Sequence, residues 1–359
     1  GGDRFDGGGG KGGGKGGPEM KPGDWVCDKC QAMNFARRTE CFQCFAPGGN
    51  GGGGGGGGGC GEAGGGGDAA AASVVLRMSN ERVAIKCISK ASVLRMQQRG
   101  GPMNENPLKE VRCLSFLTRR MSGWLAGPEV IRGDPARVLP MVDCVEDRDH
   151  IFLVMPCLNQ EVFDVVEERG GAFPEQGAAE MLAQILGGLE VAHSLGLAHH
   201  DMSLENLMTD TQGGCVIIDW GMVVKVPLTD RGRAVKIASK ASWPCRCGKL
   251  LYLAPEILSA TEASEAFDPF KLDVWACGIM LFILLTGVPP WSVETGPLPS
   301  DARFQHVCRG DLHVLLNAWG ITLSEDAVAL LQSLLWGDPN RRPSLPEIRA
   351  SPWYRRLLG

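Results

Sequence analysis

The chain has 359 residues, a formal net charge of −5 and 44% hydrophobic residues. This length fits one large domain of about 250–300 residues with small flanking segments. The hydrophobic content is ample for a core, and the negative charge excludes a global basic field that would attract nucleic acid. We expect neither a membrane span nor a signal peptide, and so no membrane partner. Without a secretory signal, the fourteen cysteines favour reduced thiols, metal binding and an intracellular location, in the cytoplasm, the nucleus or both.

Two glycine-rich segments flank a short cysteine-containing stretch near the N-terminus. Residues 1–19 and 48–67 are mostly glycine. Such sequences bury too little apolar surface to offset the entropy that is lost on ordering. We therefore predict a disordered tail over 1–19 and a flexible linker over 48–67.

Between these segments, residues 20–47 carry four cysteines with the spacing C-x2-C-x10-C-x2-C. Two close thiolate pairs can enclose a tetrahedral Zn2+ and leave no open coordination position, which indicates a structural site. So short a segment has almost no core, and zinc binding must supply its folding free energy. The predicted ligands are Cys27, Cys30, Cys41 and Cys44.

The flanks of these cysteines, with Trp25 before the first and Asn34 after the second, make the stretch resemble the Ran-binding-protein-2-type zinc finger. The resemblance implies binding of either single-stranded RNA or ubiquitin. The ubiquitin binders carry a Thr-Phe or Thr-Tyr pair where this chain has Gln31-Ala32. An aromatic ring followed by an Arg pair is typical of the RNA binders, because it can stack on a base and read guanine edges. RNA is therefore the favoured partner, and ubiquitin or another protein is the alternative. The predicted RNA-binding residues are Asp24, Met33, Phe35, Arg37 and Arg38.

Residues 68–358 contain a series of motifs whose centre lies at residues 197–221. There, Asp201 is followed five positions later by Asn206, and an apolar run ends in the triplet Asp219-Trp220-Gly221. This pattern resembles the catalytic loop and metal-binding triplet of the eukaryotic protein kinases, H-R-D-x-x-x-x-N followed by D-F-G. The resemblance implies an α+β fold, the two-lobed protein kinase fold, with a small, mainly β lobe and a larger helical lobe.

Further motifs follow the order of that family. V-A-I-K at residues 83–86 matches the strand that carries the phosphate-binding lysine. An amphipathic stretch begins near residue 107 and carries Glu110, the expected partner of that lysine, with Glu105 as a less favoured substitute. The resemblance also implies that Asp273 bonds to the backbone of the catalytic loop and that Arg342 pairs with Glu256. The apolar run at 279–285 is expected to form a buried helix too short to span a membrane.

The resemblance implies a Ser/Thr protein kinase that transfers the γ-phosphate of ATP to protein substrates with the help of Mg2+. Asp201 would orient the acceptor hydroxyl and accept its proton, and Asn206 and Asp219 would hold Mg2+. Lys86 would bind the phosphates, and Glu110 would orient Lys86. The residues implied to contact ATP are Gly67, Val74, Ala84, Lys86, Met155, Cys157, Glu161, Asn206 and Asp219.

Several positions depart from the family pattern. Ala69 and Ala72 replace two glycines of the phosphate-covering loop. Ser203 stands where Ser/Thr kinases carry a lysine that contacts the transferred phosphoryl group, and Lys249 stands where they carry a threonine. We predict that Lys249 lies close to Asp201 and takes over part of the role of the missing lysine, since positive charge there offsets charge in the transition state. The alternative for Lys249 is a side chain that points to solvent, as most lysines do. The alternative to an active kinase is a catalytically weak or inactive kinase-like scaffold whose finger recruits RNA or a protein.

Overall fold

The computed structural model covers most of the chain from residue 82 onward and two short strands before it. The chain divides into two compact units, 1–77 and 78–359. The described residues are 25–26, 33–34, 82–98, 107–122, 137–230, 232–237, 248–258 and 266–359.

The first unit is described at one strand pair. β1 (Trp25–Val26) pairs antiparallel with β2 (Met33–Asn34), and Trp25 stands opposite Asn34. The tail, the linker and the four predicted zinc ligands lie outside the described residues. So do these further predicted site residues: Asp24, Phe35, Arg37, Arg38, Gly67 and Val74.

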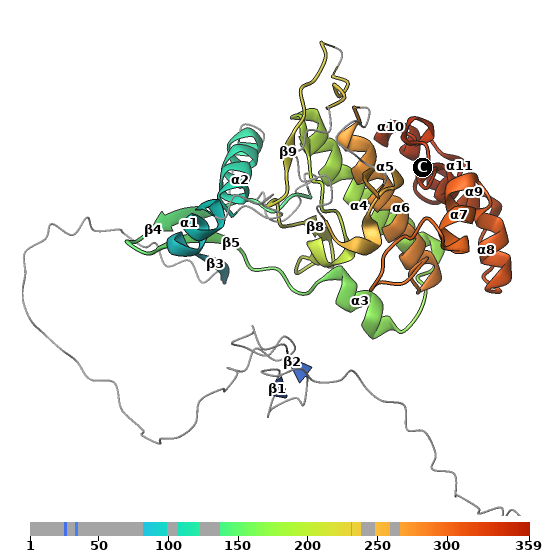
Figure 1. Cartoon of the computed structure of the whole chain (residues 1–359), viewed down its shortest axis with the longest axis horizontal. Coiled ribbons are helices and arrows are strands. Elements are labelled where there is room, and N and C mark those ends of the chain that lie inside the picture. The colour runs from blue at the N-terminus through green and yellow to red at the C-terminus, as the bar shows by residue number, and fades with distance from the viewer. Residues whose placement is uncertain are drawn as a thin grey trace, which may run out of the picture. The chain divides into compact units, whose positions relative to one another are not determined.

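The second unit opens with an antiparallel sheet in the order β3-β5-β4 (Figure 1). Its strands are β3 (Val83–Ser89), β4 (Asp143–Glu146) and β5 (His150–Pro156). The strand predicted at 83–86 is thereby confirmed. Two helices belong to this part, α1 (Lys90–Gln98) and α2 (Pro107–Ser122).

The α2 helix is amphipathic, as its sequence predicts. Leu114 and Leu117 recur at helical spacing and are buried, whereas Arg119 and Arg120 near the helix end are exposed. Glu110 sits in the first turn of α2 and is buried in spite of its charge. A buried carboxylate needs a partner that offsets the cost of its desolvation.

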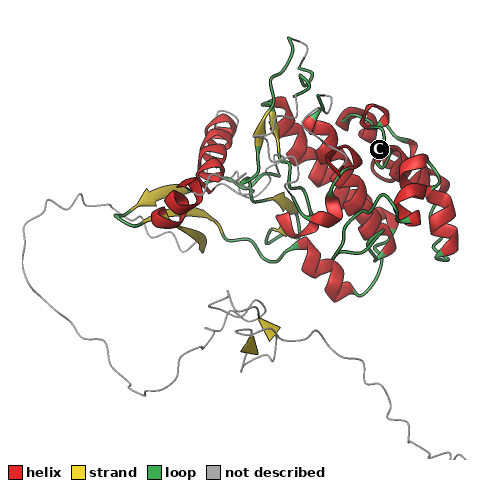
Figure 2. Ribbon diagram, in the orientation of Figure 1, coloured by secondary structure: helices red, strands yellow, loops and turns green. Residues whose placement is uncertain are grey.

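The remaining part of the second unit is mostly helical (Figure 2). Two short strand pairs position its loops: β6 (Leu197–Ala198) pairs with β9 (Val224–Lys225), and β7 (Leu207–Thr209) with β8 (Cys215–Ile217). Single-turn helices occur at η2 (Leu204–Asn206), η3 (Leu250–Tyr252) and η4 (Pro339–Arg341). The α-helices are α3 (Val162–Arg169), α4 (Glu175–Ser194), α5 (Pro255–Leu258), α6 (Pro269–Thr286), α7 (Ala302–Arg309), α8 (Leu312–Ala318), α9 (Glu325–Leu334), α10 (Leu345–Arg349) and α11 (Pro352–Leu358).

Helix α6 forms the centre of the core. It begins after Asp268, whose carboxylate accepts a hydrogen bond from the Phe270 N–H at 2.9 Å, and it ends at Gly287 in the left-handed conformation (φ 73°). A Cβ at Gly287 would lie 2.8 Å from the Ala172 nitrogen, so glycine is required there on both counts. Helices α4 and α9 pack against α6.

The expectation about the length of this apolar segment was wrong. α6 has 18 residues and a mean hydropathy of 1.6, so by length and composition it is long and apolar enough to cross a membrane. However, 83% of it is buried inside the protein, which confirms the expected role as a core helix. The run at 279–285 is only the C-terminal part of α6, which begins at Pro269, so the run alone understates the length of the helix.

Candidate active site

Asp273 of α6 fixes the catalytic loop, which we define as residues 199–206. Its carboxylate accepts hydrogen bonds from the backbone N–H groups of His199 and His200, each at 2.9 Å. His193 Nε2, at the end of α4, lies 2.8 Å from the same carboxylate. The predicted bonding of Asp273 to the loop backbone is confirmed. The sequence interpretation missed His193, because nothing in the local pattern indicates a partner eighty positions away.

Burial and neighbouring groups shift the pKa values of Asp273 and His200. Burial alone would raise the pKa of the Asp273 carboxyl, but the hydrogen bond and attraction to His193, with attraction to His199 and the N–H of His200, hold it below its ordinary value. Burial lowers the pKa of His200 to about 4, so its imidazole is neutral at pH 7. Asp273 therefore remains an acceptor for the loop backbone throughout the physiological range.

Asp201 and Asn206 are held together within the catalytic loop. The Asn206 Nδ2 group donates to the Asp201 carbonyl oxygen at 2.6 Å and to the Asp201 carboxylate at 2.9 Å. Ser203 caps the η2 turn, because its Oγ accepts from the Asn206 N–H at 3.3 Å. The loop thus presents one carboxylate and one amide side chain at the predicted five-residue spacing.

The β7–β8 hairpin brings Asp219 to this loop. Asn206 immediately precedes β7, and the Ile218 N–H, just after β8, donates to the Asn206 carbonyl oxygen at 3.0 Å. Asp219 follows Ile218 with a positive φ of 56°, and its carboxylate accepts a hydrogen bond from the Gly221 N–H at 3.1 Å. The two predicted magnesium ligands therefore come from adjacent strand ends, as the motif spacing requires.

Trp220 stands in the triplet where the family pattern has phenylalanine, and its side chain is buried in the core. Its ring meets the His199 ring edge-on, with centroids 4.6 Å apart. His199 Nε2 also lies 2.9 Å from the Ile218 carbonyl oxygen. These contacts join the start of the catalytic loop to the residue before Asp219.

Lys86 and Glu110 form the predicted ion pair. The Lys86 Nζ lies 2.6 Å from Glu110 Oε2, and the Glu110 side chain is only 3% exposed. β3 carries Lys86 and α2 carries Glu110, so this ion pair connects the sheet to the helix. Glu110 thus pairs with Lys86 as expected, and Glu105 lies outside the described residues.

The residues expected around adenine lie on neighbouring strands and on the segment that follows them. Ala84 of β3 is directly opposite Met155 of β5 in the ladder. Cys157 is exposed just after β5, and Glu161 is half-buried at the start of α3. Burial and the nearby charges of Asp164 and Glu205 raise the pKa of Glu161, against an opposing effect of Lys249.

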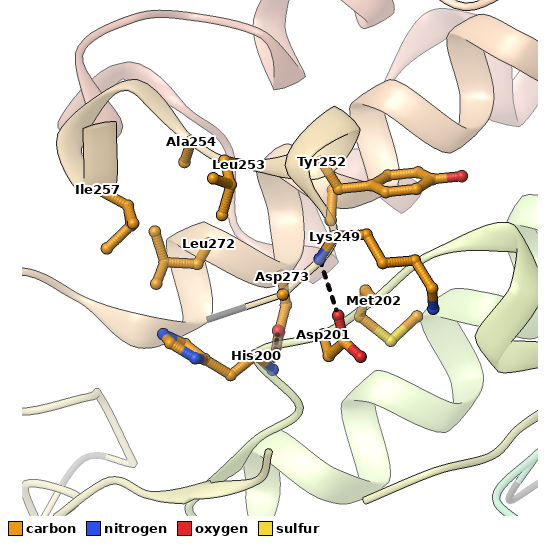
Figure 3. Close-up of a pocket in the computed structure, with 12 residues that line it drawn as sticks. His200, Asp201, Met202, Lys249, Tyr252, Leu253, Ala254, Ile257, Leu272 and Asp273 are labelled. Atoms are coloured by element: carbon orange, nitrogen blue, oxygen red, sulfur yellow. Dashed lines mark hydrogen bonds between the residues drawn. The ribbon is translucent and has the colours of Figure 1, made fainter. Parts of the chain in front are cut away.

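Lys249 lies against the catalytic loop with both its backbone and its side chain. Its N–H donates to Asp201 Oδ1 at 3.2 Å, the contact drawn as a dashed line in Figure 3. Its Nζ donates to Ser203 Oγ at 2.8 Å and to Asn206 Oδ1 at 3.1 Å. The prediction that Lys249 lies close to Asp201 is confirmed, and the double contact with Ser203 and Asn206 adds to it.

Gly248 makes this approach possible. Its φ is +98°, and a Cβ there would lie 3.3 Å from Asp201 Oδ1. Glycine is therefore favoured by conformation and by space. Tyr252 supports the loop from the same segment, because its hydroxyl accepts from the Leu204 N–H at 3.3 Å and lies 3.4 Å from Glu205 Oε2.

Comparison with known proteins decides the family. Residues 61–354 match the family described as protein kinase domain. The chain belongs to the protein kinase family. Residues 21–50 match a second family, described as Zn-finger in Ran binding protein and others. The α+β kinase fold inferred from the motifs is therefore confirmed, together with the finger upstream of it.

The relatives of this kinase domain include plant Ser/Thr kinases. Calcium-dependent protein kinase 29 of Arabidopsis thaliana is 29% identical over 278 residues, which are 77% of this chain and 45% of that relative. CBL-interacting serine/threonine-protein kinase 16 of the same organism is 29% identical over 280 residues, or 77% of this chain and 52% of the relative. The chain thus spans about half the length of the curated relatives it matches.

The side chains of this kinase domain fit ATP and Mg2+. A carboxylate and an amide oxygen, from Asp219 and Asn206, are hard oxygen ligands of the kind that Mg2+ prefers. Within the described part of the chain, no group of three or more His, Cys, Asp or Glu residues forms a metal site. A magnesium site in a kinase does not need one, because water and substrate phosphates complete the coordination. Lys86, oriented by Glu110, provides a cation for the phosphates.

Proposed function

We propose that the chain is an active, ATP-dependent Ser/Thr protein kinase that transfers the γ-phosphate to hydroxyl groups of protein substrates. The observation that carries this proposal is the formed Lys86–Glu110 ion pair, with 2.6 Å between Nζ and Oε2. In this family the pair must be in place for the lysine to align the phosphates. Because Glu110 is buried and a buried carboxylate is costly without a partner, the pair holds the Lys86 ammonium group in this position.

The mechanism follows from the positions of the side chains. ATP with Mg2+ supplies the phosphoryl group and the metal charge. Lys86 binds the phosphates, and Asn206 and Asp219 are the residues that would hold the metal. Asp201 orients the acceptor hydroxyl and accepts its proton as the new oxygen–phosphorus bond forms and the bond to ADP breaks.

Transfer of labelled γ-phosphate to a generic basic protein, with and without Mg2+, tests this proposal. We expect transfer by the wild-type chain in the presence of Mg2+ and a loss of about 10²–10⁴-fold in Asp201→Asn, which removes the proton acceptor. Asp230→Asn, an exposed position on the activation segment (residues 219–256), is the matched control. Binding of ATP without any transfer by the wild-type chain would instead assign the scaffold role.

We further propose that the zinc finger at residues 20–47 binds single-stranded RNA, with Phe35 stacking on a base and Arg37 and Arg38 contacting base edges. The support is the pattern of residues in a stretch that matches the Ran-binding type of finger. A stacked base contributes about 1–3 kcal/mol, so Phe35→Ala should weaken binding to a pool of single-stranded RNA by roughly 5- to 100-fold without loss of zinc. Tighter binding to ubiquitin than to this RNA pool would move the finger to the protein-binding class.

An intracellular location, in the cytoplasm, the nucleus or both, is also proposed. Its support is the large number of cysteines that the described residues keep as free thiols, among them buried Cys113 and Cys215. A fluorescent fusion of the full chain tests it, and an exclusively extracellular signal would contradict it.

A further inference from the structure

Two side chains of the active site have exchanged places relative to the family pattern. A hydroxyl, Ser203, occupies the catalytic-loop position where Ser/Thr kinases carry a lysine, and Lys249 occupies the activation-segment position where they carry a threonine. Taken singly, each change would remove an active-site group. The structure joins them, because the Lys249 Nζ donates to Ser203 Oγ at 2.8 Å. The same two functional groups are therefore present, and the segments that carry them are reversed.

The ammonium group of Lys249 is held at a defined place. Besides Ser203, it contacts Asn206 Oδ1 at 3.1 Å, and the Asn206 Nδ2 lies 2.9 Å from the Asp201 carboxylate. Ser203 is fully buried and Asn206 nearly so. An ammonium group has three N–H donors, and these two contacts use two of them. The Lys249 ammonium group is therefore linked through the Asn206 side chain to the Asp201 carboxylate, which accepts the proton.

The backbone of Lys249 is fixed as firmly as its side chain. Its N–H donates to Asp201 Oδ1 at 3.2 Å, and Gly248 before it adopts a conformation that favours glycine. A lysine whose side chain points to solvent would need neither the backbone hydrogen bond to Asp201 nor a glycine before it. The positive charge of Lys249 also opposes the rise in the Glu161 pKa that burial and Glu205 cause. Its electrostatic effect therefore extends beyond the two side chains with which it forms hydrogen bonds.

We propose that Lys249 supplies the positive charge next to the transferred phosphoryl group, in place of the lysine that is absent at position 203. The inference rests on the proposed kinase function. During transfer, the acceptor oxygen bonds to phosphorus, the bond to ADP breaks and Asp201 takes the proton. Lys249 changes no bond and acts by its charge, which is worth most where charge develops in the transition state. Because the activation segment carries this cation, catalysis requires that segment to be docked on the catalytic loop.

The test compares four variants of the full chain. Lys249→Thr should lower kcat by about 10²–10³-fold with little change in the affinity for ATP, since the missing donor acts mainly in the transition state. Lys249→Arg, which keeps the charge, should retain more activity than Lys249→Thr. The double exchange Ser203→Lys with Lys249→Thr restores the family arrangement and should recover most of the loss. Lys225→Met, an exposed lysine on the same segment, should leave kcat unchanged.

A binding measurement separates a role at the phosphate from a purely structural one. ADP with Mg2+ and aluminium fluoride mimics the transferred group, and Lys249→Thr should bind this combination about 10²–10³-fold more weakly while binding ADP alone normally. Equal affinity for the analogue, or wild-type turnover in Lys249→Thr, would overturn the inference alone. A wild-type chain that transfers no phosphate would overturn the proposed function itself.

Discussion

Arg342 and Glu256 form a two-pronged ion pair, with Nη1 2.6 Å from Oε1 and Nη2 2.7 Å from Oε2. The Arg342 side chain is completely buried, and it also donates to the carbonyl oxygens of Trp336 and Lys271. Glu256 lies at the end of the activation segment, whereas Arg342 follows η4. The pair therefore connects the activation segment to the C-terminal helices, as the motifs predict.

Arg342→Met should lower the free energy of unfolding by about 3–5 kcal/mol, because it leaves Glu256 and two carbonyl groups without their buried donor. The urea midpoint, measured by circular dichroism, reports the change. Arg356→Met is the matched control: Arg356 pairs with Glu175 on the surface, where ion pairs contribute little. Equal midpoints for the two variants would contradict the assigned importance of the buried pair.

Glu110→Ala should weaken the apparent affinity for ATP. A hydrogen bond to a charged group contributes about 1.5–3 kcal/mol, so the loss of the orienting partner of Lys86 should cost roughly 10- to 100-fold. Calorimetric titration with ATP and Mg2+ measures it. Glu146→Ala removes an exposed carboxylate that pairs with Lys90 in the same part of the fold and should bind ATP normally. Unchanged affinity in Glu110→Ala would argue against the orienting role.

His200 should make the stability of the second unit depend on pH. Its pKa is about 4 in the folded protein against 6.5 for the free side chain, because burial disfavours the charged imidazole. Between these two values the unfolded chain binds a proton that the folded chain does not. The free energy of unfolding should therefore fall as the pH is lowered through this window, by up to about 1.4 kcal/mol per pH unit from this group.

His200→Asn isolates that contribution, because asparagine does not titrate and tolerates a positive φ such as the 68° observed at this position. Urea unfolding at pH 7 and pH 5 should show a smaller pH effect in the variant than in the wild type. Identical pH effects in both proteins would contradict the assignment of the titration to His200.

Lys249→Met should tighten the binding of divalent cations in the absence of nucleotide. The Lys249 Nζ now lies 3.1 Å from Asn206 Oδ1, the oxygen implied to hold Mg2+. Two unit charges about 4 Å apart repel by about 1 kcal/mol even at the dielectric constant of water, so removal of the ammonium should raise the affinity by roughly fivefold or more. Titration with Mn2+, followed by electron paramagnetic resonance, measures this affinity. Equal Mn2+ affinities of the wild type and Lys249→Met would show that the ammonium group does not compete with the cation for Asn206.

Removal of zinc should affect only the finger. A strong chelator should remove the zinc that Cys27, Cys30, Cys41 and Cys44 are predicted to bind, abolish the proposed RNA binding and leave the thermal unfolding of the kinase domain unchanged, because a short four-cysteine segment depends on its metal for folding. Differential scanning calorimetry of the full chain, with and without chelator, provides the measurement. A lowered kinase transition would show that the two units are energetically coupled.

Motif spacing predicted much of the site because the groups concerned sit at fixed positions on regular elements. V-A-I-K placed Lys86 on a strand, and helical periodicity placed Glu110 on an amphipathic helix, beside its apolar face. The strand pair β7–β8 brings Asn206 and Asp219 together for the same reason. In each case local sequence determines the element, and the element determines the direction of the side chain.

The remaining contacts depend on tertiary structure. The apolar run at 279–285 is only the C-terminal part of α6, which begins at Pro269. Only the folded chain supplies the His193, His199 and His200 groups that satisfy the Asp273 carboxylate of this helix. The Lys249–Ser203 contact joins positions 46 residues apart. Two departures from a motif could be recognised from the sequence, but their mutual distance required the fold.

Helix α6 also has a consequence for synthesis of the chain on the ribosome. One of its packing partners, α4, precedes it in the sequence, but another, α9, ends only at Leu334, roughly 50 residues after Thr286. At about 5–20 residues per second, α6 therefore waits several seconds for that partner after it has been made. During this time a segment as apolar as a membrane span is incompletely covered, so the nascent chain offers a binding site for chaperones that the finished protein no longer has.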